Sequence, residues 1–196
     1  MTHDHAARDL SALARLTEKM AGEGLAIARM ASRFVATLKG GGTLFFAGNG
    51  GSAADAQHIA TEYVVRYREP RRAFAAVALT TDSSLLTAAG NDLGFEEVFA
   101  RQVEALCQPD DLLVLHSTSG DSPNLIRAAE TARQRRVPVV ALLGKGGGQL
   151  RHLVDDSLVV PSDTTSHIQA MHLAIEHIIV EMVEDIWLEN NPDGQP

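Results

Sequence analysis

Residues 43–52 read T-L-F-F-A-G-N-G-G-S, a short apolar run followed by a loop of small residues. The apolar run, 43–47, is short and ends at a glycine, which is typical of a buried strand. Residues 48–51 interrupt it, and helical spacing begins at Ser52 and continues to about Arg66. Strand, glycine-rich loop and helix in this order predict the first unit of a parallel α/β domain.

The same alternation continues to the end of the chain. Four further segments are predicted as strands: 73–79, 111–116, 137–143 and 158–160. Helices are predicted at 83–89, 95–107, 122–135 and 166–189, with a loop at 91–94. Alternating strands and helices predict a parallel sheet covered on both faces. Five strands suit a doubly wound sheet in the flavodoxin-like order.

The first forty residues precede this alternation and form a helical arm. Leu10, Leu13, Leu16 and Met20 recur at helical spacing, and a second such series runs from Leu25 to Leu38. No internal linker interrupts the rest, so we expect one domain over 1–196. It would consist of the arm at about 1–40, an α/β core at about 43–189 and a frayed tail at 190–196.

Composition narrows the function classes. The chain has 196 residues, 45% of them hydrophobic, and a formal net charge of −8. This balance argues against a nucleic-acid surface, which needs a basic patch, but allows a small phosphate ligand held by backbone N–H groups. The lone Cys107 is expected to be a buried, reduced thiol. With no secretory signal and no apolar run of membrane-spanning length, the expected location is the cytoplasm, without a membrane partner.

Two loops rich in small polar residues follow the first and third predicted strands. They read G-N-G-G-S at 48–52 and S-T-S-G-D-S at 117–122. In an open α/β sheet, ligands bind beyond the carboxyl ends of the strands where the strand order reverses. In the flavodoxin-like order that point lies between these two strands. Composition and topology therefore predict the same binding place.

Each loop also opens a helix, whose N-terminus favours anions. Ser52 is predicted as an N-cap with Asp55 as its capping-box partner, and Ser122 as an N-cap followed by Pro123. Ser117, Thr118, Ser119 and Ser122 add hydroxyl groups, and Gly120 would let the backbone approach an anion. The loops are expected to cradle a phosphate; the alternative is a pair of ordinary capped turns.

Two predicted helices carry side chains suited to a metal. His58 and Glu62 are four residues apart and share a helix face, and Gln169 and His177 lie two turns apart on the final helix. Two imidazoles and a carboxylate can bind Zn²⁺, although a glutamine oxygen is an unusual fourth ligand. The alternative is a solvated helix face. No role is assigned to His116.

Taken together, these motifs resemble a known family. G-N-G-G-S, A-x-H-x-x-x-E, N-D-x-G-F, S-T-S-G-x-S and I-Q-x-x-H follow one another along the chain, and the similarity runs from about residue 10 to residue 187. This is the order found in phosphoheptose isomerases, which belong to the sugar isomerase (SIS) domain class. The resemblance implies an SIS fold and an aldose-ketose isomerase that converts sedoheptulose 7-phosphate to D-glycero-D-manno-heptose 7-phosphate. That reaction begins the synthesis of activated heptose for bacterial surface glycans such as lipopolysaccharide.

The resemblance also implies site residues, a cofactor and an assembly. It makes His58, Glu62, Gln169 and His177 the ligands of one zinc ion per active site, and the chain a homotetramer whose sites are built from neighbouring subunits. The implied sugar and phosphate contacts are Asn49, Gly50, Gly51, Ser52, Glu62, Asn91, Asp92, Ser117, Thr118, Ser119, Ser122 and Gln169. The sequence departs from the family where His167 and Ala170 replace an arginine and a glutamate, and where Ser166 replaces an acidic residue. These departures fall on the wall of the site.

A ketose-to-aldose shift moves a proton between C1 and C2 through an enediolate, so it needs a base and an acid. Glu62 is the candidate base and His177 the candidate acid/base toward the sugar oxygens. One alternative is a non-enzymatic SIS protein that associates with the replication initiator. Another is an SIS enzyme acting on other sugar phosphates. The complete set of metal and acid/base residues favours the isomerase over the non-enzymatic protein. The N-D-x-G-F and I-Q-x-x-H motifs weigh against an enzyme for other sugar phosphates.

Overall fold

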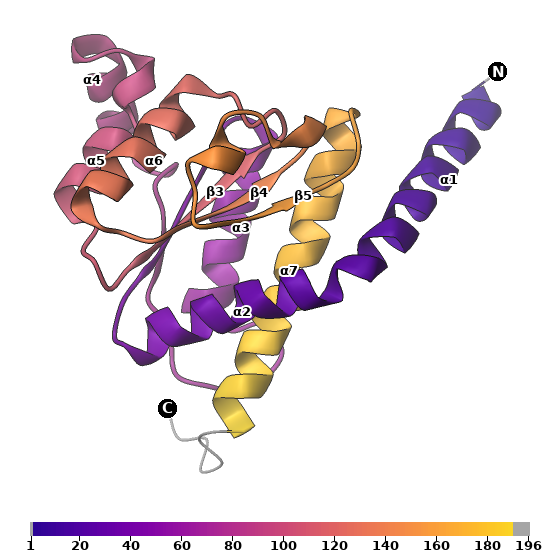
Figure 1. Cartoon of the computed structure of the whole chain (residues 1–196), viewed down its shortest axis with the longest axis horizontal. Coiled ribbons are helices and arrows are strands. Elements are labelled where there is room, and N and C mark those ends of the chain that lie inside the picture. The colour runs from indigo at the N-terminus through magenta and orange to yellow at the C-terminus, as the bar shows by residue number, and fades with distance from the viewer. Residues whose placement is uncertain (1, 190–196) are drawn as a thin grey trace.

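The computed structural model describes residues 2–189, with side chains from residue 4 onward, as an α/β fold around a five-stranded parallel sheet (Figure 1). The strands are β1 (Leu44–Gly48), β2 (Ala76–Ala78), β3 (Leu112–Ser117), β4 (Val139–Leu143) and β5 (Asp156–Val159). Their order is β2-β1-β3-β4-β5, and every neighbouring pair is parallel. This confirms the predicted doubly wound, flavodoxin-like sheet.

Helices cover both faces of the sheet. The helices are α1 (Thr2–Met20), α2 (Gly24–Lys39), α3 (Gly51–Val64), α4 (Ser83–Asp92), α5 (Ala100–Leu106), α6 (Pro123–Arg135) and α7 (Thr165–Glu189). Short 3₁₀ turns occupy Ala21–Glu23, Phe95–Glu97, Lys145–Gly147 and Leu150–His152. The predicted frayed tail at 190–196 lies outside the described residues.

Side-chain alternation along the strands divides the core into two layers. Leu44, Phe46, Leu112 and Val114 pack on one face with α2, α3 and α7. Phe45, Leu113 and their same-face neighbours pack on the other with α5 and α6, where Cys107 is also buried. Burial raises the pKa of the Cys107 thiol to about 12, so this thiol is protonated, and its buried position is the expected one.

The arm is built as predicted, and α1 extends away from the body of the domain (Figure 1). Other predicted segments differ in extent. The predicted strand at 73–79 pairs only over β2, at the edge of the sheet. The predicted helix at 95–107 is a 3₁₀ turn followed by the short α5. Among residues 2–189, no helix combines the length and the apolarity needed to cross a bilayer.

Candidate active site

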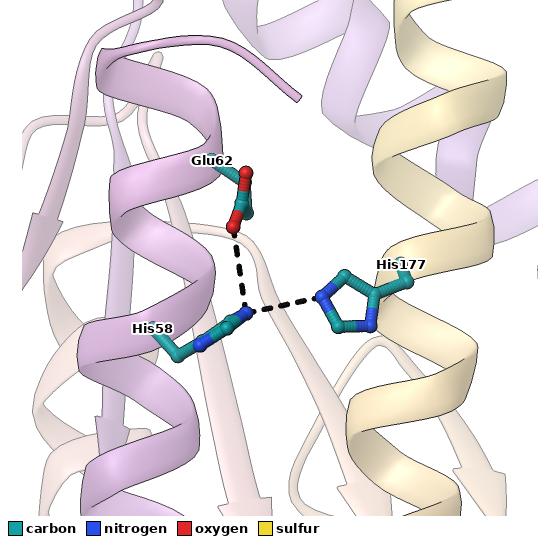
Figure 2. A group of neighbouring side chains, drawn as sticks. All are labelled: His58, Glu62 and His177. Atoms are coloured by element: carbon teal, nitrogen blue, oxygen red, sulfur yellow. Dashed lines mark hydrogen bonds and ion pairs between the residues drawn. The ribbon is translucent and has the colours of Figure 1, made fainter. Parts of the chain in front are cut away.

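Helices α3 and α7 bring together His58, Glu62 and His177, as Figure 2 shows. The Nε2 atom of His58 lies 3.1 Å from Nε2 of His177 and 3.4 Å from Oε1 of Glu62. One ligand atom from each residue lies within 4.8 Å of the other two. The rings of His58 and His177 meet edge to face at 81°. The pairing expected from helical spacing is therefore present, and His177 faces it from the second helix.

This arrangement suits a tetrahedral zinc ion. Donor atoms about 2.0–2.1 Å from one tetrahedral ion lie roughly 3.3 Å from each other. The two distances around His58, 3.1 Å and 3.4 Å, bracket that separation. Three protein ligands would leave a fourth position for water or substrate, as in catalytic zinc sites. The donor set thus fits the metal that the resemblance implies.

The two small-residue loops converge as predicted. Gly48, at the end of β1, is the register partner of His116 in β3, so both loops leave the sheet side by side. The side-chain amides of Asn49 and Asn124 then exchange two hydrogen bonds, at 2.9 Å and 2.8 Å. Asn124 was not among the predicted site residues. Asn124 lies in the first turn of the helix that opens at the second loop, and this position could have indicated that it belongs to the site.

The start of α3 differs from the prediction. The helix begins at Gly51, and its N-cap is Gly50 with φ 57°. No side chain caps this helix, so the predicted capping box of Ser52 and Asp55 is wrong. Glycine adopts a positive φ that other residues avoid. Because Gly50 takes this conformation as the N-cap, the helix begins at Gly51, one residue before Ser52. Ser52 instead lies buried in the first turn.

In the second loop, two of the predicted hydroxyls brace the loop itself. Ser117 Oγ accepts the Gly120 N–H at 3.0 Å, and Ser119 Oγ accepts the Asp121 N–H at 3.1 Å. Ser122 is the N-cap residue of α6, as expected, but its side chain makes no capping hydrogen bond. Thr118 and Ser119 are partly exposed at the tip of the loop. The loop is therefore pre-shaped by its own hydrogen bonds.

Gly120 is required for packing within the protein. Its φ is +73°, and a Cβ atom there would lie 1.9 Å from the carbonyl oxygen of Gly147. We expect Gly120→Ala to lose about 2–5 kcal/mol of unfolding free energy, from left-handed strain plus overpacking. Urea unfolding measures this loss.

Gly22→Ala is the matched control, because its Cβ would meet no atom within 4 Å. That variant should be as stable as the wild type or slightly more stable. A Gly120→Ala variant that unfolds at the wild-type urea concentration would contradict this explanation of the loop.

The remaining predicted residues lie apart from the His/Glu/His group. The predicted loop at 91–94 is partly wrong, because Asn91 and Asp92 form the end of α4, where the Asn91 amide donates to Asp92 at 2.7 Å. Asp92 lines a groove between α4 and α5, whereas Gly94 and Phe95 line a hollow with Asn49. Within one chain, Asn91 and Asp92 are not placed with His58 and His177.

Gln169 lies at the first loop. A Cβ atom added to Gly51 would come within 2.5 Å of the Gln169 side chain. His167, one of the departures from the family pattern, is buried and faces Asp9 of the arm at 3.2 Å.

Sequence reasoning missed a buried polar cluster behind the site. His116 Nε2 lies 2.7 Å from Glu176 Oε1, and both side chains are buried. Burial lowers the pKa of His116, but the charge and hydrogen bond of Glu176 outweigh burial and raise the pKa overall. Nearby His172 donates to the Leu143 carbonyl, and burial lowers its pKa to about 4, which keeps it neutral. A lone histidine in a strand gave no signal of this partnership across 60 residues.

The fold and the paired loops are those of a known class of protein, the sugar isomerase (SIS) domain. The SIS domain model matches residues 10–144 of this chain. The phosphoheptose isomerase of Akkermansia muciniphila is 50% identical over 165 residues, which cover 84% of this chain and 86% of that protein. That of a Bradyrhizobium species (strain BTAi1) is 49% identical over 186 residues, or 95% and 93% of the two chains.

A solved structure agrees with these relatives. The phosphoheptose isomerase of Neisseria gonorrhoeae superposes with a TM-score of 0.90 at 36% identity, and the match covers 94% of this chain and 100% of that one. The chain therefore belongs to the phosphoheptose isomerase family of SIS-domain proteins.

Proposed function

We propose that this protein isomerises sedoheptulose 7-phosphate to D-glycero-D-manno-heptose 7-phosphate, within one SIS domain spanning the chain. The observation that carries the proposal is the assembly of His58 and Glu62 on α3 with His177 on α7, in a member of this family whose α3 also opens at the first loop. From Gly51 to His58 the helix rises roughly 10 Å. An open-chain seven-carbon sugar can span such a separation, with its phosphate at the loop and its C1 and C2 near the metal group.

The phosphate end would be held by the two loops. Asn49, Gly50, Gly51 and Ser52 contribute from the first loop, and Ser117, Thr118, Ser119 and Ser122 from the second. Support comes from the convergence of the loops through the Asn49–Asn124 pair and from the two helix N-termini that open there. The Ser117 and Ser119 hydroxyls can donate their protons to a phosphate while their oxygens accept loop N–H groups.

At the other end, Glu62 would take the proton from one carbon and return it to the neighbouring carbon. His177 would transfer a proton to or from the sugar oxygens, because these oxygens change charge as the enediolate forms. Zinc, held by His58, Glu62 and His177, would polarise the carbonyl and hydroxyl oxygens. The Gln169 side chain lies against Gly51 at the first loop, which favours a contact to the sugar; as a fourth zinc ligand it would have to turn away from Gly51.

Asn91 and Asp92 would reach the site from a neighbouring subunit of a homotetramer. Their position on α4, away from His58 and His177 in the same chain, favours a shared site. Exposed apolar side chains flank the metal group, with Val64 and Val65 at the end of α3 and Ile178 beside His177. A second subunit would cover this surface. The cytoplasmic location is part of the proposal and rests on family membership.

The alternatives are weaker. A non-enzymatic protein that associates with the replication initiator has no need for the assembled metal group, and the similarity to two phosphoheptose isomerases favours a heptose phosphate over other sugar phosphates. A panel of hexose, pentose, amino-sugar and heptose phosphates separates the isomerases. Turnover of sedoheptulose 7-phosphate alone would support the assignment, and turnover of none of them would contradict it.

Removal of zinc should abolish the isomerisation. Because the three ligands would be left without the ion that polarises the substrate oxygens, we expect dialysis against a chelator to lower turnover by at least about 10²-fold. One equivalent of Zn²⁺ per chain should restore it. Elemental analysis of the purified protein measures the metal content alongside turnover. A metal-free protein with full activity would contradict the proposed cofactor.

A further inference from the structure

The backbone of the segment that follows α3 is held against α7 by one carboxylate. Glu184 Oε1 accepts the N–H of Tyr67 at 2.9 Å, and Oε2 accepts those of Arg68 and Glu69 at 2.9 Å and 3.1 Å. The Arg71 Nε atom donates to Oε1 at 2.8 Å. The side chains of Arg71 and Glu184 are each only 1% exposed. This buried clamp fixes the backbone of residues 67–69.

The clamp also reaches the end of the site helix. Arg71 Nη1 donates to the carbonyl oxygen of Tyr63 at 2.9 Å, and Nη2 donates to that of Glu62 at 2.7 Å. These carbonyls belong to the last turn of α3, where the carbonyl groups at the end of a helix have no N–H partner within the helix. The backbone that carries Glu62 is therefore tied to the same anchor as the segment of Tyr67.

The consequence is a ring contact inside the candidate active site. The Tyr67 ring stacks on the imidazole of His177, with centroids 5.4 Å apart and planes 16° apart. His58 meets the same imidazole with its centroid 5.1 Å away. The ring torsion of a histidine is broad, so its plane must be fixed by neighbours. Among residues 2–189, the side-chain hydrogen bond of the His177 ring joins it to His58. His58 is itself a candidate metal ligand, so it is not an outer partner that could orient the ring.

We propose that Tyr67 is a positioning residue, held by Glu184 and Arg71, which fixes the ring plane of His177 for metal binding and proton transfer. The inference rests on the proposed function, because it assigns His177 to that site. Ligating histidines are usually oriented by a hydrogen-bonded outer partner, and loss of that partner lowers metal affinity about 10–100-fold. At His177, the aromatic face of Tyr67 would orient the ring in place of a hydrogen-bonded partner.

The test compares Tyr67→Leu with Tyr67→Phe. Phenylalanine keeps the planar face, so its Zn²⁺ affinity and kcat should stay within about twofold of wild type, whereas leucine should weaken Zn²⁺ binding about 10–100-fold. Competition with a chromophoric chelator measures the affinity. The visible spectrum of the Co²⁺-substituted protein reports the ligand geometry independently of turnover. In the leucine variant kcat should fall more than KM rises.

Glu69→Gln is the control, since its exposed side chain lies on the same segment and Glu184 contacts only its backbone. If Tyr67→Leu fails to fold by circular dichroism, Tyr67→Met removes the planar face with an unbranched side chain. A variant without the ring that keeps wild-type Zn²⁺ affinity, Co²⁺ spectrum and kcat would overturn the inference. A wild type that binds no metal overturns the proposed zinc site instead, and kcat of the leucine and phenylalanine variants then decides the role of Tyr67.

Discussion

Replacing Glu62 with glutamine should lower kcat for sedoheptulose 7-phosphate by about 10²- to 10⁴-fold, the usual contribution of a positioned general base. Glutamine keeps the size of the side chain but cannot accept the proton. The Glu62 side chain lies next to His58 and is 22% exposed, so substrate can reach it while the fold does not depend on it. Turnover is measured at saturating Zn²⁺, which separates loss of the base from loss of a metal ligand.

Glu104→Gln is the matched control, because Glu104 is an exposed carboxylate on α5 whose partner is the nearby Arg101. It should leave kcat and KM unchanged. Near-normal turnover by Glu62→Gln, with an unchanged circular dichroism spectrum, would remove Glu62 from the mechanism. The base would then have to come from another side chain of the site.

Replacing Glu184 with alanine should destabilise the protein by about 3–5 kcal/mol, since it leaves the Arg71 charge buried and unpaired. Three backbone N–H groups of the segment after α3 lose their acceptor at the same time. Urea unfolding measures the loss. Glu181→Gln is the control: Glu181 pairs with Arg68 on the surface, where an ion pair contributes about 0–1 kcal/mol. Equal stability of the two variants would contradict the clamp.

The same clamp predicts a dependence on pH. Burial raises the pKa of Glu184, but the N–H groups of Arg68, Tyr67 and Glu69 and the charge of Arg71 lower it below its usual value overall. A carboxyl with a depressed folded pKa contributes stability above its unfolded pKa and loses it as the pH falls through the folded pKa. The stability difference between wild type and Glu184→Gln should therefore shrink in acid. A difference that grows with falling pH would contradict this sign.

Most of the fold could be predicted because it depends on patterns that run along the chain. Alternation of strands and helices specified the parallel sheet, and two loops of small residues marked the place where the strand order reverses. His58 and Glu62 were paired by helical spacing alone. These features need no knowledge of distant contacts.

The errors arose where backbone conformation overrode residue preference. Ser52 is a good N-cap by type, but Gly50 adopts the positive φ that starts α3 earlier. Asn91 and Asp92 favour turns, yet they extend α4, whose N-cap Asp82 accepts the N–H of Leu85.

Other features could not be predicted from one sequence because they join distant residues. Glu184 accepts N–H groups from residues 115 to 117 positions earlier, and no local pattern indicates this. The stacking of Tyr67 on His177 likewise follows only after α3 and α7 are placed side by side. The same holds for the buried His116–Glu176 pair, in which each residue alone resembles an ordinary helix or strand position.

The most direct test of the account is a crystal structure of the protein with bound sedoheptulose 7-phosphate, with anomalous scattering recorded at the zinc edge. The phosphate should lie between the loops at 48–52 and 117–122, and a single anomalous peak should lie between His58, Glu62 and His177 of each chain. The sugar carbons C1 and C2 should face Glu62. A phosphate bound away from these loops, or a site without metal at the three side chains in an active crystal, would contradict it.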